Sequence, residues 1–399
     1  MKMKSASLKK CCWVLLLLLL TVPAWATGEE VKGLDTEQGA DYTYTAATTG
    51  VLRTLEGNDD FPDKSGVLYN TLSDDYNVIK VTGTGEGAIP AFVFGGVSIE
   101  ETADATHNTV TVTGGTVARW VIGGHSTSSA NYNKVTVSGS AQIGESDDDD
   151  NDDESVPQGI EGGVGAGNGS PTGNHVIIGG DAVIGSENAA EYWSKVAGGY
   201  GLGTGAVQSN TVEIQGGEIN VRVVGGEGNG SGNVTGNRVI IAGGTLNGTR
   251  INGGLSVTEP EQEGSSGSGN TSSNVVDIQA SVTTGEIHGG EVDADHTASE
   301  NRVRLWGKGN TPITIGPKEE NGTLDIAGGV VRAKDGTDGG AAANNTVGIY
   351  GAVQFEDKVD LYGGKVGNNG SPDGNRLVLA LNDKSLLPLK VNTLAGFAS

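Results

Sequence analysis

A short motif recurs along the chain and limits what it can fold into: an Asn whose second and fourth following residues are apolar. Ten copies can be read, the first of them weak, and they begin at Asn77, Asn108, Asn133, Asn174, Asn210, Asn237, Asn274, Asn301, Asn345 and Asn375. On a β-strand alternate residues point to the same side, so the Asn and the two apolar residues share one face. A unit this short cannot bury that face alone and must stack on its neighbours, as solenoid repeats do.

Paired glycines form a second regularity. They follow an apolar stretch later in most units, at 123–124, 162–163, 198–199, 225–226, 253–254, 289–290, 328–329 and 363–364. The distance from the second Gly to the next motif Asn is 11 residues in five units, whereas motif-to-motif spacing from Asn108 onward ranges from 25 to 44. Insertions are therefore concentrated at fixed points of the unit, which is typical of loops on a repeated scaffold. Because Gly adopts positive φ without strain, we expect sharp corners at the glycines directly after the motif strands, as at 114–115, 216–217 and 243–244, and at the glycine pairs that follow apolar stretches.

Both regularities predict an all-β fold, a right-handed parallel β-helix of roughly nine to ten coils that spans residues 77–381. Stacked coils would place Asn on Asn, and such side-chain amides can bond to the ones above and below. A β-propeller would need regular antiparallel blades and more aromatic residues than the 5% present, and a disordered chain rich in its 68 glycines would lack the period.

The first 26 residues have the pattern of a secretory signal peptide. Four lysines precede an apolar run that contains Leu15 to Leu20, and Ala24-Trp25-Ala26 gives a cleavage site before Thr27. An uncleaved membrane helix is the alternative, but the apolar run is about 10 residues where a span needs roughly 20. Both cysteines, Cys11 and Cys12, lie in this leader. The mature chain would then have no disulfide and no cysteine-based zinc site.

Charge narrows the choice of partners. Without the four leader lysines the chain has 21 basic and 49 acidic side chains, a net charge of −28. Such an excess argues against nucleic acid and against an anionic membrane surface as partners. The acidic run at 147–154 could bind Ca²⁺ loosely, but like charges without interspersed Gly favour a solvated loop.

The signal peptide, the Asn-x-Val-x-Ile-x-Gly-Gly repeats and the absence of later cysteines resemble the passenger domains of bacterial autotransporters, the type V secretion family. Residues 375–381 and 391–397 look like the segment near the end of such passengers, and the resemblance covers roughly residues 77–399. It implies a Gram-negative, adhesin-like protein at the cell surface or outer membrane, or released outside the cell. It also implies a C-terminal outer-membrane β-barrel in the full-length chain, for which the tail after Asn375 is too short. A truncated sequence, a broken gene or another exporter would explain this, and we expect truncation.

The expected organisation is therefore a signal peptide at 1–26, an N-terminal cap region at 27–76, the β-helix at 77–381 and the start of a junction segment at 382–399. Insertions at 145–172, 186–209 and 255–273 are the candidate display loops.

No catalytic, cofactor-binding or metal-binding residues are expected. The five histidines form no metal-ligand spacing, no Gly-x-Ser-x-Gly occurs, and residues 27–76 are too few for a protease domain. A β-helix lyase or glycosidase needs carboxylates clustered with each other or with Arg and Lys on one outer face. The outer positions next to the motif Asn show no such acidic cluster.

These outer positions instead carry basic residues in several coils. The candidate basic column consists of Lys134, His175, Arg238, Arg302 and Arg376. Spaced cations can simply deter edge pairing, or the column can bind an acidic glycan or protein. We therefore expect a non-enzymatic adhesin or structural module whose partners are host surface glycans or proteins, or further copies of itself. A secreted β-helix enzyme acting on glycans is the alternative.

Overall fold

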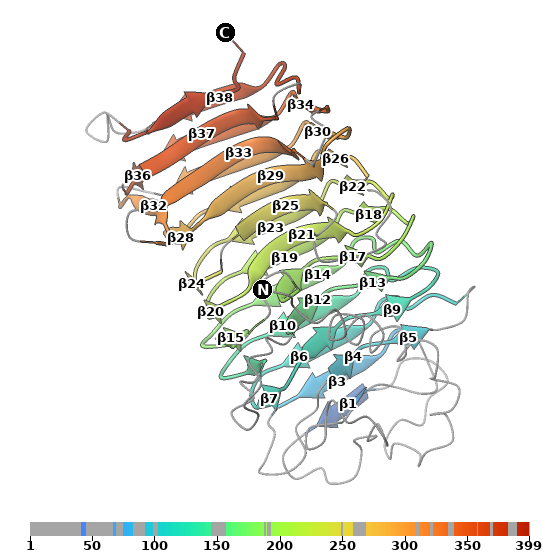
Figure 1. The fold of residues 1–399 in the computed structure, drawn as a ribbon. Coiled ribbons are helices and arrows are strands. Elements are labelled where there is room, and N and C mark those ends of the chain that lie inside the picture. Colours follow the sequence, from blue (N-terminus) through green and yellow to red (C-terminus); the bar gives the residue numbers. More distant parts are fainter. Residues whose placement is uncertain are drawn as a thin grey trace, which may run out of the picture.

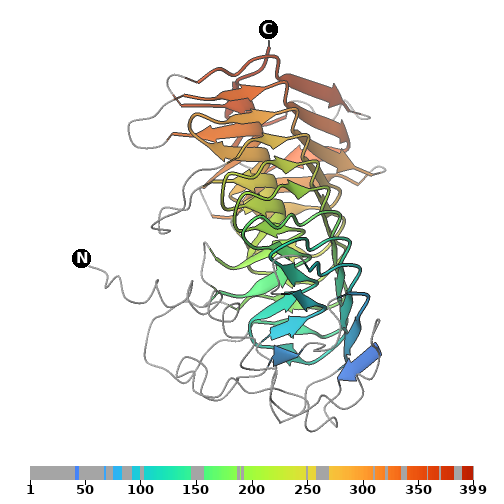
Figure 2. The same ribbon diagram turned by 90° about the vertical axis from the view of Figure 1, so that its right-hand side faces the viewer.

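The computed structural model describes residues 41–44, 67–68, 75–82, 92–98, 103–144, 157–186, 189, 193–248, 250–257, 269–308, 311–319, 322–333, 339–356, 358–367, 370–381 and 389–398. Within these ranges the protein is all-β and contains no helix. Its strands pair in parallel and lie in successive coils along one axis (Figures 1 and 2). The predicted parallel β-helix is confirmed.

The motif strands form one long sheet, here called sheet A. Its order is β1 (Asp41–Tyr44), β3 (Val78–Val81), β6 (Thr109–Val112), β10 (Lys134–Val137), β14 (His175–Ile178), β19 (Thr211–Ile214), β23 (Arg238–Ile241), β27 (Val275–Ile278), β31 (Arg302–Gly307), β35 (Thr346–Gly351) and β38 (Arg376–Ala380). Each strand pairs with the corresponding strand of the next coil, so equivalent motif positions lie in straight columns.

The strands that approach or contain the paired glycines form the second long sheet, sheet B. Its main path is β2 (Val67–Leu68), β4 (Phe92–Phe94), β8 (Trp120–Ile122), β12 (Gly159–Glu161), β16 (Lys195–Ala197), β21 (Arg222–Gly228), β25 (Arg250–Ser256), β29 (Glu286–Asp293), β33 (Thr323–Arg332), β37 (Lys358–Lys365) and β39 (Thr393–Ala395). In the early coils, separate strands continue this sheet beyond the glycines: β5 (Val97–Ser98), β9 (His125–Ser126), β13 (Val164–Gly165) and β17 (Tyr200–Gly201).

Three smaller sheets complete the coils. One follows sheet A and contains β7 (Thr116–Val117), β11 (Gln142–Ile143), β15 (Val183–Ile184), β20 (Glu218–Ile219) and β24 (Thr245–Leu246). In later coils its place between sheets A and B is taken by β28 (Val282–Thr284), β32 (Ile313–Pro317) and β36 (Val353–Phe355). The third precedes sheet A and contains β18 (Val207–Gln208), β22 (Val234–Thr235), β26 (Thr271–Ser272), β30 (Thr297–Ser299) and β34 (Ala341–Ala343).

The stack extends beyond the predicted limits on both sides. Sheet A has 11 strands, compared with an expected nine to ten coils, because β1 pairs with β3 from inside the range 27–76. β2 from the same range pairs with β4, and β39 from the range 382–399 pairs with β37. Parts of both flanking segments therefore continue the β-helix.

The core runs through the coils as columns of β-branched side chains. Val110, Val135, Val176 and Val212 follow one another at the second motif position, and each is 0% exposed. Full burial of such a side chain contributes roughly 1.5–3 kcal/mol, and each added coil buries several. The apolar period of the sequence thus becomes the main stabilising element of the rod.

The predicted Asn column is present and its hydrogen bonds are fully paired in the interior. Asn210 donates from Nδ2 to Asn237 Oδ1 at 2.9 Å and to the carbonyl oxygen of Pro171 at 2.9 Å. The same Oδ1 of Asn237 also accepts the backbone N–H of Asn210 at 2.9 Å. This pattern makes a buried polar column tolerable, because every amide donor and acceptor has a partner.

The glycines fall into two structural classes, one of which differs from the prediction. Gly115, Gly217 and Gly244 have φ values of 77°, 89° and 86° at the corner after sheet A, as expected. The pairs near sheet B are not corners of this kind, because β21, β25, β29, β33 and β37 continue through them and none of the paired glycines has positive φ. A Cβ at Gly226 would lie 2.5 Å from Cγ of Asn237. These pairs are glycine because the Asn column packs directly against their backbone.

The turn that enters each motif has a feature that the sequence pattern does not predict. The residue before each motif Asn has positive φ, and seven of these ten residues are not glycine: Tyr76, His107, Tyr132, Ser209, Ser273, Glu300 and Asn344. The repeated geometry of the coil imposes this conformation on residues that rarely adopt it. At the first three coils it stacks the exposed rings of Tyr76, His107 and Tyr132 on one another.

No helix within the described ranges is long and apolar enough to cross a membrane. The predicted signal peptide at 1–26 and the acidic run at 147–154 lie outside the described residues, as does most of the insertion at 255–273.

Candidate functional site

The outer face of sheet A displays the candidate basic column. In register along the stack, its first outward positions are Thr109, Lys134, His175, Thr211, Arg238, Val275, Arg302, Thr346 and Arg376. The structure therefore places the five predicted site residues in one column. Lys134 and His175 are direct neighbours on adjacent strands. Thr211, Val275 and Thr346 separate the remaining members, which therefore lie two strands apart, about 10 Å.

Two members of the column are already paired with acids. His175 Nε2 lies 3.6 Å from Glu213, and Arg238 Nη2 lies 2.5 Å from Asp277 Oδ2. Burial lowers the pKa of His175 below its usual 6.5, although Glu213 acts in the opposite direction. His175 is therefore neutral at pH 7 and adds no charge to the column.

Asp277 lies in the neighbouring outward column and neutralises this part of the face. It is 2% exposed and also accepts Arg304 Nη2 at 2.7 Å. By contrast, Lys134, Arg302 and Arg376 are exposed, and none has an acidic partner within the described part of the chain. Within the column, only these three remain available as cations, and Lys80 of β3 is exposed in the neighbouring outward column.

Two aromatic residues share this face with Arg302 and Arg376. Trp306 is 43% exposed, and its ring stacks with that of Tyr350 on the next strand at a centroid distance of 5.2 Å. A Cβ at Gly348 would lie 2.6 Å from the hydroxyl oxygen of Tyr350. The Tyr350 ring thus lies back across the glycine, flat against the sheet.

The outer face of sheet B has a different character. Both glycines of a pair pack against the Asn column, so the chain bends at the pair. The side chains just before and just after the pair therefore point toward each other on the outer face of sheet B. In the early coils this face is apolar and aromatic, with Phe92, Phe94, Trp120 and Ile122 in one buried cluster. In the following coils it carries charged side chains that are also buried.

The first charged cluster joins three coils. Lys195 is 2% exposed; its Nζ lies 3.5 Å from Glu161 and 3.3 Å from Glu227, and 3.2 Å from the ring centroid of Tyr200. Arg222 Nη2 donates to Glu227 at 2.9 Å. The cluster therefore holds two carboxyl groups and two cations in a space with almost no water.

The two carboxylates of this cluster have pKa values displaced in opposite directions. Burial raises the pKa of Glu161 to about 7, with Lys195 opposing the shift. Burial also acts to raise the pKa of Glu227, but Arg222 and Lys195 outweigh it and the pKa is lowered. One protonated and one ionised carboxyl group side by side is an arrangement that acid–base enzymes use.

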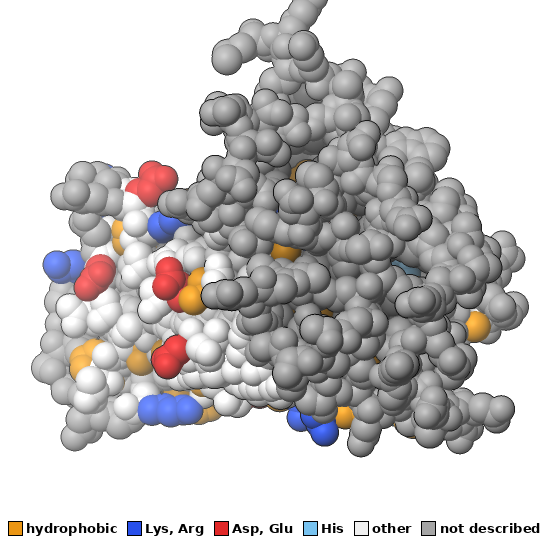
Figure 3. Space-filling view, turned by 90° about the horizontal axis from the view of Figure 1, so that it is seen from below, with side chains coloured by type: hydrophobic (Ala, Val, Ile, Leu, Met, Phe, Trp, Pro, Cys, Tyr) orange, Lys and Arg blue, Asp and Glu red, His pale blue; other side chains and the backbone are white. Residues whose placement is uncertain are grey.

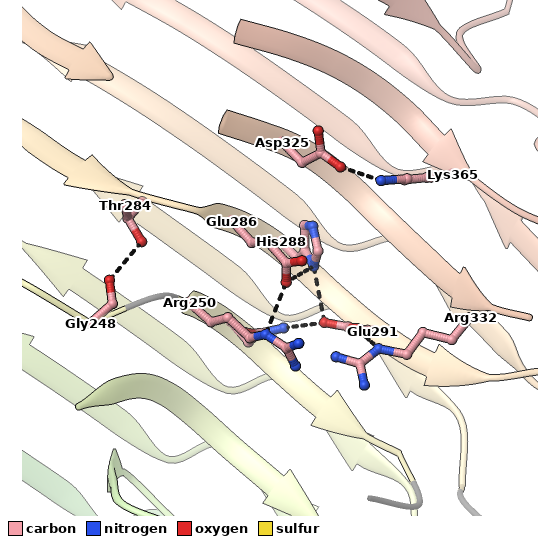
Figure 4. A network of polar contacts seen from close by, with 10 residues as sticks. Gly248, Arg250, Thr284, Glu286, His288, Glu291, Asp325, Arg332 and Lys365 are labelled. Carbon is pink, nitrogen blue, oxygen red and sulfur yellow. Dashed lines mark hydrogen bonds and ion pairs between the residues drawn. The ribbon is translucent and has the colours of Figure 1, made fainter. Parts of the chain in front are cut away.

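A second charged cluster lies further along the same face (Figure 4). His288 Nδ1 is 3.0 Å from Glu291 Oε2, and Arg250 Nε is 3.2 Å from Glu286 Oε2. Glu291 also forms an ion pair with Arg332. Burial acts to raise the pKa of Glu291, yet Arg332 and His288 outweigh it and the pKa is strongly lowered.

Glu286, His288 and Glu291 also form the one group of potential metal ligands among the residues described. Their ligand atoms lie within 4.8 Å of one another, and carboxylate and imidazole ligands suit zinc. However, Arg250 and Arg332 already neutralise both carboxylates. A divalent cation would face two fixed positive charges, so the arrangement favours an ion-pair network over a metal centre.

The sequence pattern did not predict these clusters. It shows no acidic cluster at the outer positions next to the motif Asn, but carboxylates do meet Arg or Lys on sheet B, and Asp277 meets Arg238 and Arg304 on sheet A. In the two clusters on sheet B, the residues that pair between coils are 32 to 41 positions apart in the sequence and meet only through the strand register. The available signal was the residues that flank the glycine pairs, such as Glu161, Glu227 and the sequence His288-Gly-Gly-Glu291.

The two faces also differ in accessibility. Charged residues on sheet B are 1–5% exposed in the clusters around Lys195 and Glu291, apart from the rim residues Arg250, Glu286 and Arg332. Seen end-on along the rod, acidic and basic side chains of the described residues are interspersed and not separated by sign (Figure 3).

Comparison of the chain with protein-family models, curated proteins and solved structures gives no match. The fold and the geometry of these two faces are therefore the only guides to function.

Proposed function

We propose that this protein is an exported β-helix module that is displayed at the cell surface and translocated by type V (autotransporter) secretion. It acts as an adhesin or as a structural or binding module. The observation that carries the proposal is the outer face of sheet A. It is a long, regular surface on which three exposed cations have no acidic partner among the described residues and a stacked aromatic pair is partly exposed, whereas the acid–base groups on sheet B are buried and paired. A surface of this kind suits binding at several points along an extended partner.

The three unpaired cations give a direct test. Lys134, Arg302 and Arg376 replaced together by Gln should reduce binding of the purified chain to host cells and to anionic glycans. The binding of the unaltered chain should also weaken as salt rises, because exposed charges are screened. Surface plasmon resonance against immobilised glycans and counting of bound cells measure the two effects.

The matched control removes the same number of exposed cations elsewhere. Lys308, Lys318 and Lys390 are exposed and lie outside the strands of sheet A. Replacing these three by Gln leaves the net charge equal to that of the test variant. Equal losses in both variants would mean that overall charge, and not the column, determines binding.

A glycan-active enzyme is the second candidate, and the cluster of Glu161, Lys195 and Glu227 favours it. Its carboxyl groups have the displaced pKa values expected of an acid–base pair. Reducing-sugar release and the absorbance of unsaturated uronates, measured over a panel of polysaccharides, test this activity. Turnover that disappears in Glu161→Gln would replace the binding-module proposal.

A further inference from the structure

The outer face of sheet A carries a local combination that occurs at one end of the described stack. Trp306 and Tyr350 are the only Trp, Tyr or Phe residues at outward positions of the motif strands whose side chains the structure describes. The two nearest exposed arginines of the column, Arg302 and Arg376, have no acidic partner among the described residues. The aromatic pair and the unpaired arginines therefore occupy the same three strands, β31, β35 and β38.

We propose that this face is a binding site for a saccharide chain that bears carboxylates, a uronate polymer or oligosaccharide. The inference depends on the proposed binding function and names its ligand class and site. The aromatic pair would hold the apolar face of a sugar ring, and the arginines would bind the carboxylate.

The aromatic platform is preformed. Because Gly348 has no side chain, the Tyr350 ring lies across it and presents one side away from the sheet. Trp306 stacks beside it with an interplanar angle of 29° and remains 43% exposed. Large, rigid, partly exposed rings of this kind are the usual apolar contact of a ligand site that has a few polar groups beside it.

The dimensions fit one sugar unit between platform and cations. Trp306 is four residues beyond Arg302 on the same strand, about 13 Å at the rise of a β-strand. Because the Tyr350 ring lies over Gly348, two residues from the column, it is only about 7 Å along the strand from the column. A guanidinium group on a long side chain can span the remaining distance, and its planar fork matches a carboxylate.

The distribution of charge along the column favours a carboxylate-bearing saccharide as the ligand and this end of sheet A as its site. Elsewhere in the column Arg238 is neutralised by Asp277, and His175 is adjacent to Glu213. Arg302 and Arg376 lie two strands apart, about 10 Å, with Thr346 between them. Two positive charges at that separation suit a chain with repeated carboxylates better than a single small anion.

The experiment measures binding of the purified full chain to two unsulfated, carboxylate-bearing probes, an oligogalacturonate and a hyaluronan oligosaccharide, by isothermal titration calorimetry. Neutral maltohexaose and a poly-glutamate peptide are the comparison ligands. We expect at least one carboxylate-bearing saccharide to bind, and both comparison ligands to bind at least about tenfold more weakly, since each lacks one of the two interactions.

Three variants locate the site. Trp306→Ala and the double change Arg302→Gln/Arg376→Gln should each weaken binding about tenfold or more. Gly348→Val should do the same by lifting the Tyr350 ring, without removing any ligand-contacting group. Tyr132→Ala and Lys390→Gln alter an exposed ring and an exposed cation elsewhere and should leave binding unchanged. Circular dichroism checks that each variant is folded.

Three outcomes would overturn the inference. Saccharide binding that is unaffected in all three variants would place the site elsewhere and leave the proposed binding function standing. Binding of poly-glutamate as tight as that of the saccharide would mean that the aromatic pair does not contribute to recognition of a sugar ring. No binding of either saccharide, while the chain still adheres to host cells, would reject the ligand class but not the function; loss of adhesion as well would reject both.

Discussion

At the scale of single residues, the Asn column shows how a polar group can hold an apolar core in register. Each interior side-chain amide accepts hydrogen bonds from the Asn of one neighbouring coil and donates one to the Asn of the other. A substitution at any position therefore affects both neighbours. Asn237, which is 0% exposed, accepts two hydrogen bonds from Asn210 and donates to Asn274 and to Val207. The column therefore specifies which coil residue lies over which.

Replacing Asn237 by Ala should destabilise the protein by about 3 kcal/mol or more, because the N–H donors of Asn210 lose their acceptor inside the core. Urea unfolding followed by circular dichroism measures this loss. Asn247 is exposed and also uses its amide for hydrogen bonds, so Asn247→Ala is the matched control and should cost little. Similar losses at both sites would contradict the importance of burial in the column.

Glu161 should make stability depend on pH in the opposite sense to most carboxylates. Its pKa is raised from 4.5 to about 7, so the folded state retains a proton that the unfolded state has released. Stability from this group is full below about pH 4.5 and is lost as pH rises through about 7, by on the order of 3 kcal/mol.

Glu161→Gln should therefore flatten the stability profile between about pH 4.5 and 7. Denaturant unfolding at a series of pH values measures the profile. Glu218→Gln, at an exposed position, should leave it unchanged. An unaltered slope in Glu161→Gln would show that the carboxyl group is ionised in the folded protein at pH 6.

At the scale of elements, the glycine pairs determine how sheet B meets the Asn column. Side chains at these positions would collide with the amides, so the backbone itself forms the packing surface. The same bend makes the side chains before and after each pair converge on the outside. One local choice of residue thus produces both the tight interior and the charged clusters of the outer face.

Gly226→Ala should destabilise β21 and its neighbours by about 2–3 kcal/mol, the usual cost of overpacking a closed core. Gly179→Ala is the matched control, since the atoms nearest to an added Cβ there belong to Gln215 at 3.9 Å and 4.0 Å. Thermal unfolding of both variants compares the two sites. A loss of stability at Gly179 as large as that at Gly226 would mean that glycine is required there for its backbone freedom and not because a side chain would collide with the Asn column.

At the scale of the whole molecule, the rod is a one-dimensional array in which each coil depends on the two beside it. Strands in the middle, such as β19 and β23, pair on both edges, whereas β38 pairs with β35 alone within the described stack. The side chains of β38 are correspondingly exposed, including Leu379 at 53%. Stability in such arrays is approximately a sum of coil and interface terms.

Backbone amides of β38 should therefore exchange hydrogen for deuterium much faster than those of β19 and β23. Mass spectrometry of peptides from a deuterated native sample measures the difference. Peptides from β10 or β14, which also pair on both edges, should behave like the central strands. Uniform protection along the rod would contradict a stack of nearest-neighbour interactions and would indicate one global unfolding unit.

The sequence alone determined the repeat, the parallel β-helix, the Asn column and the alignment of Lys134, His175, Arg238, Arg302 and Arg376, because all of these follow from the period and the alternation of one strand. It also determined the corner glycines. It led to a wrong expectation for the glycine pairs, since a sequence does not distinguish a glycine that turns from one that makes room.

Only the tertiary structure decided which charges meet. Glu161, Lys195 and Glu227 lie in three coils, and their contacts depend on a register fixed by packing over the full stack. The same holds for Asp277, which pairs with Arg238 and Arg304 from the two adjacent strands and not with Arg302. Local pattern sets which face a residue occupies, whereas the interactions of that residue are set by neighbours that are distant in sequence and adjacent in space.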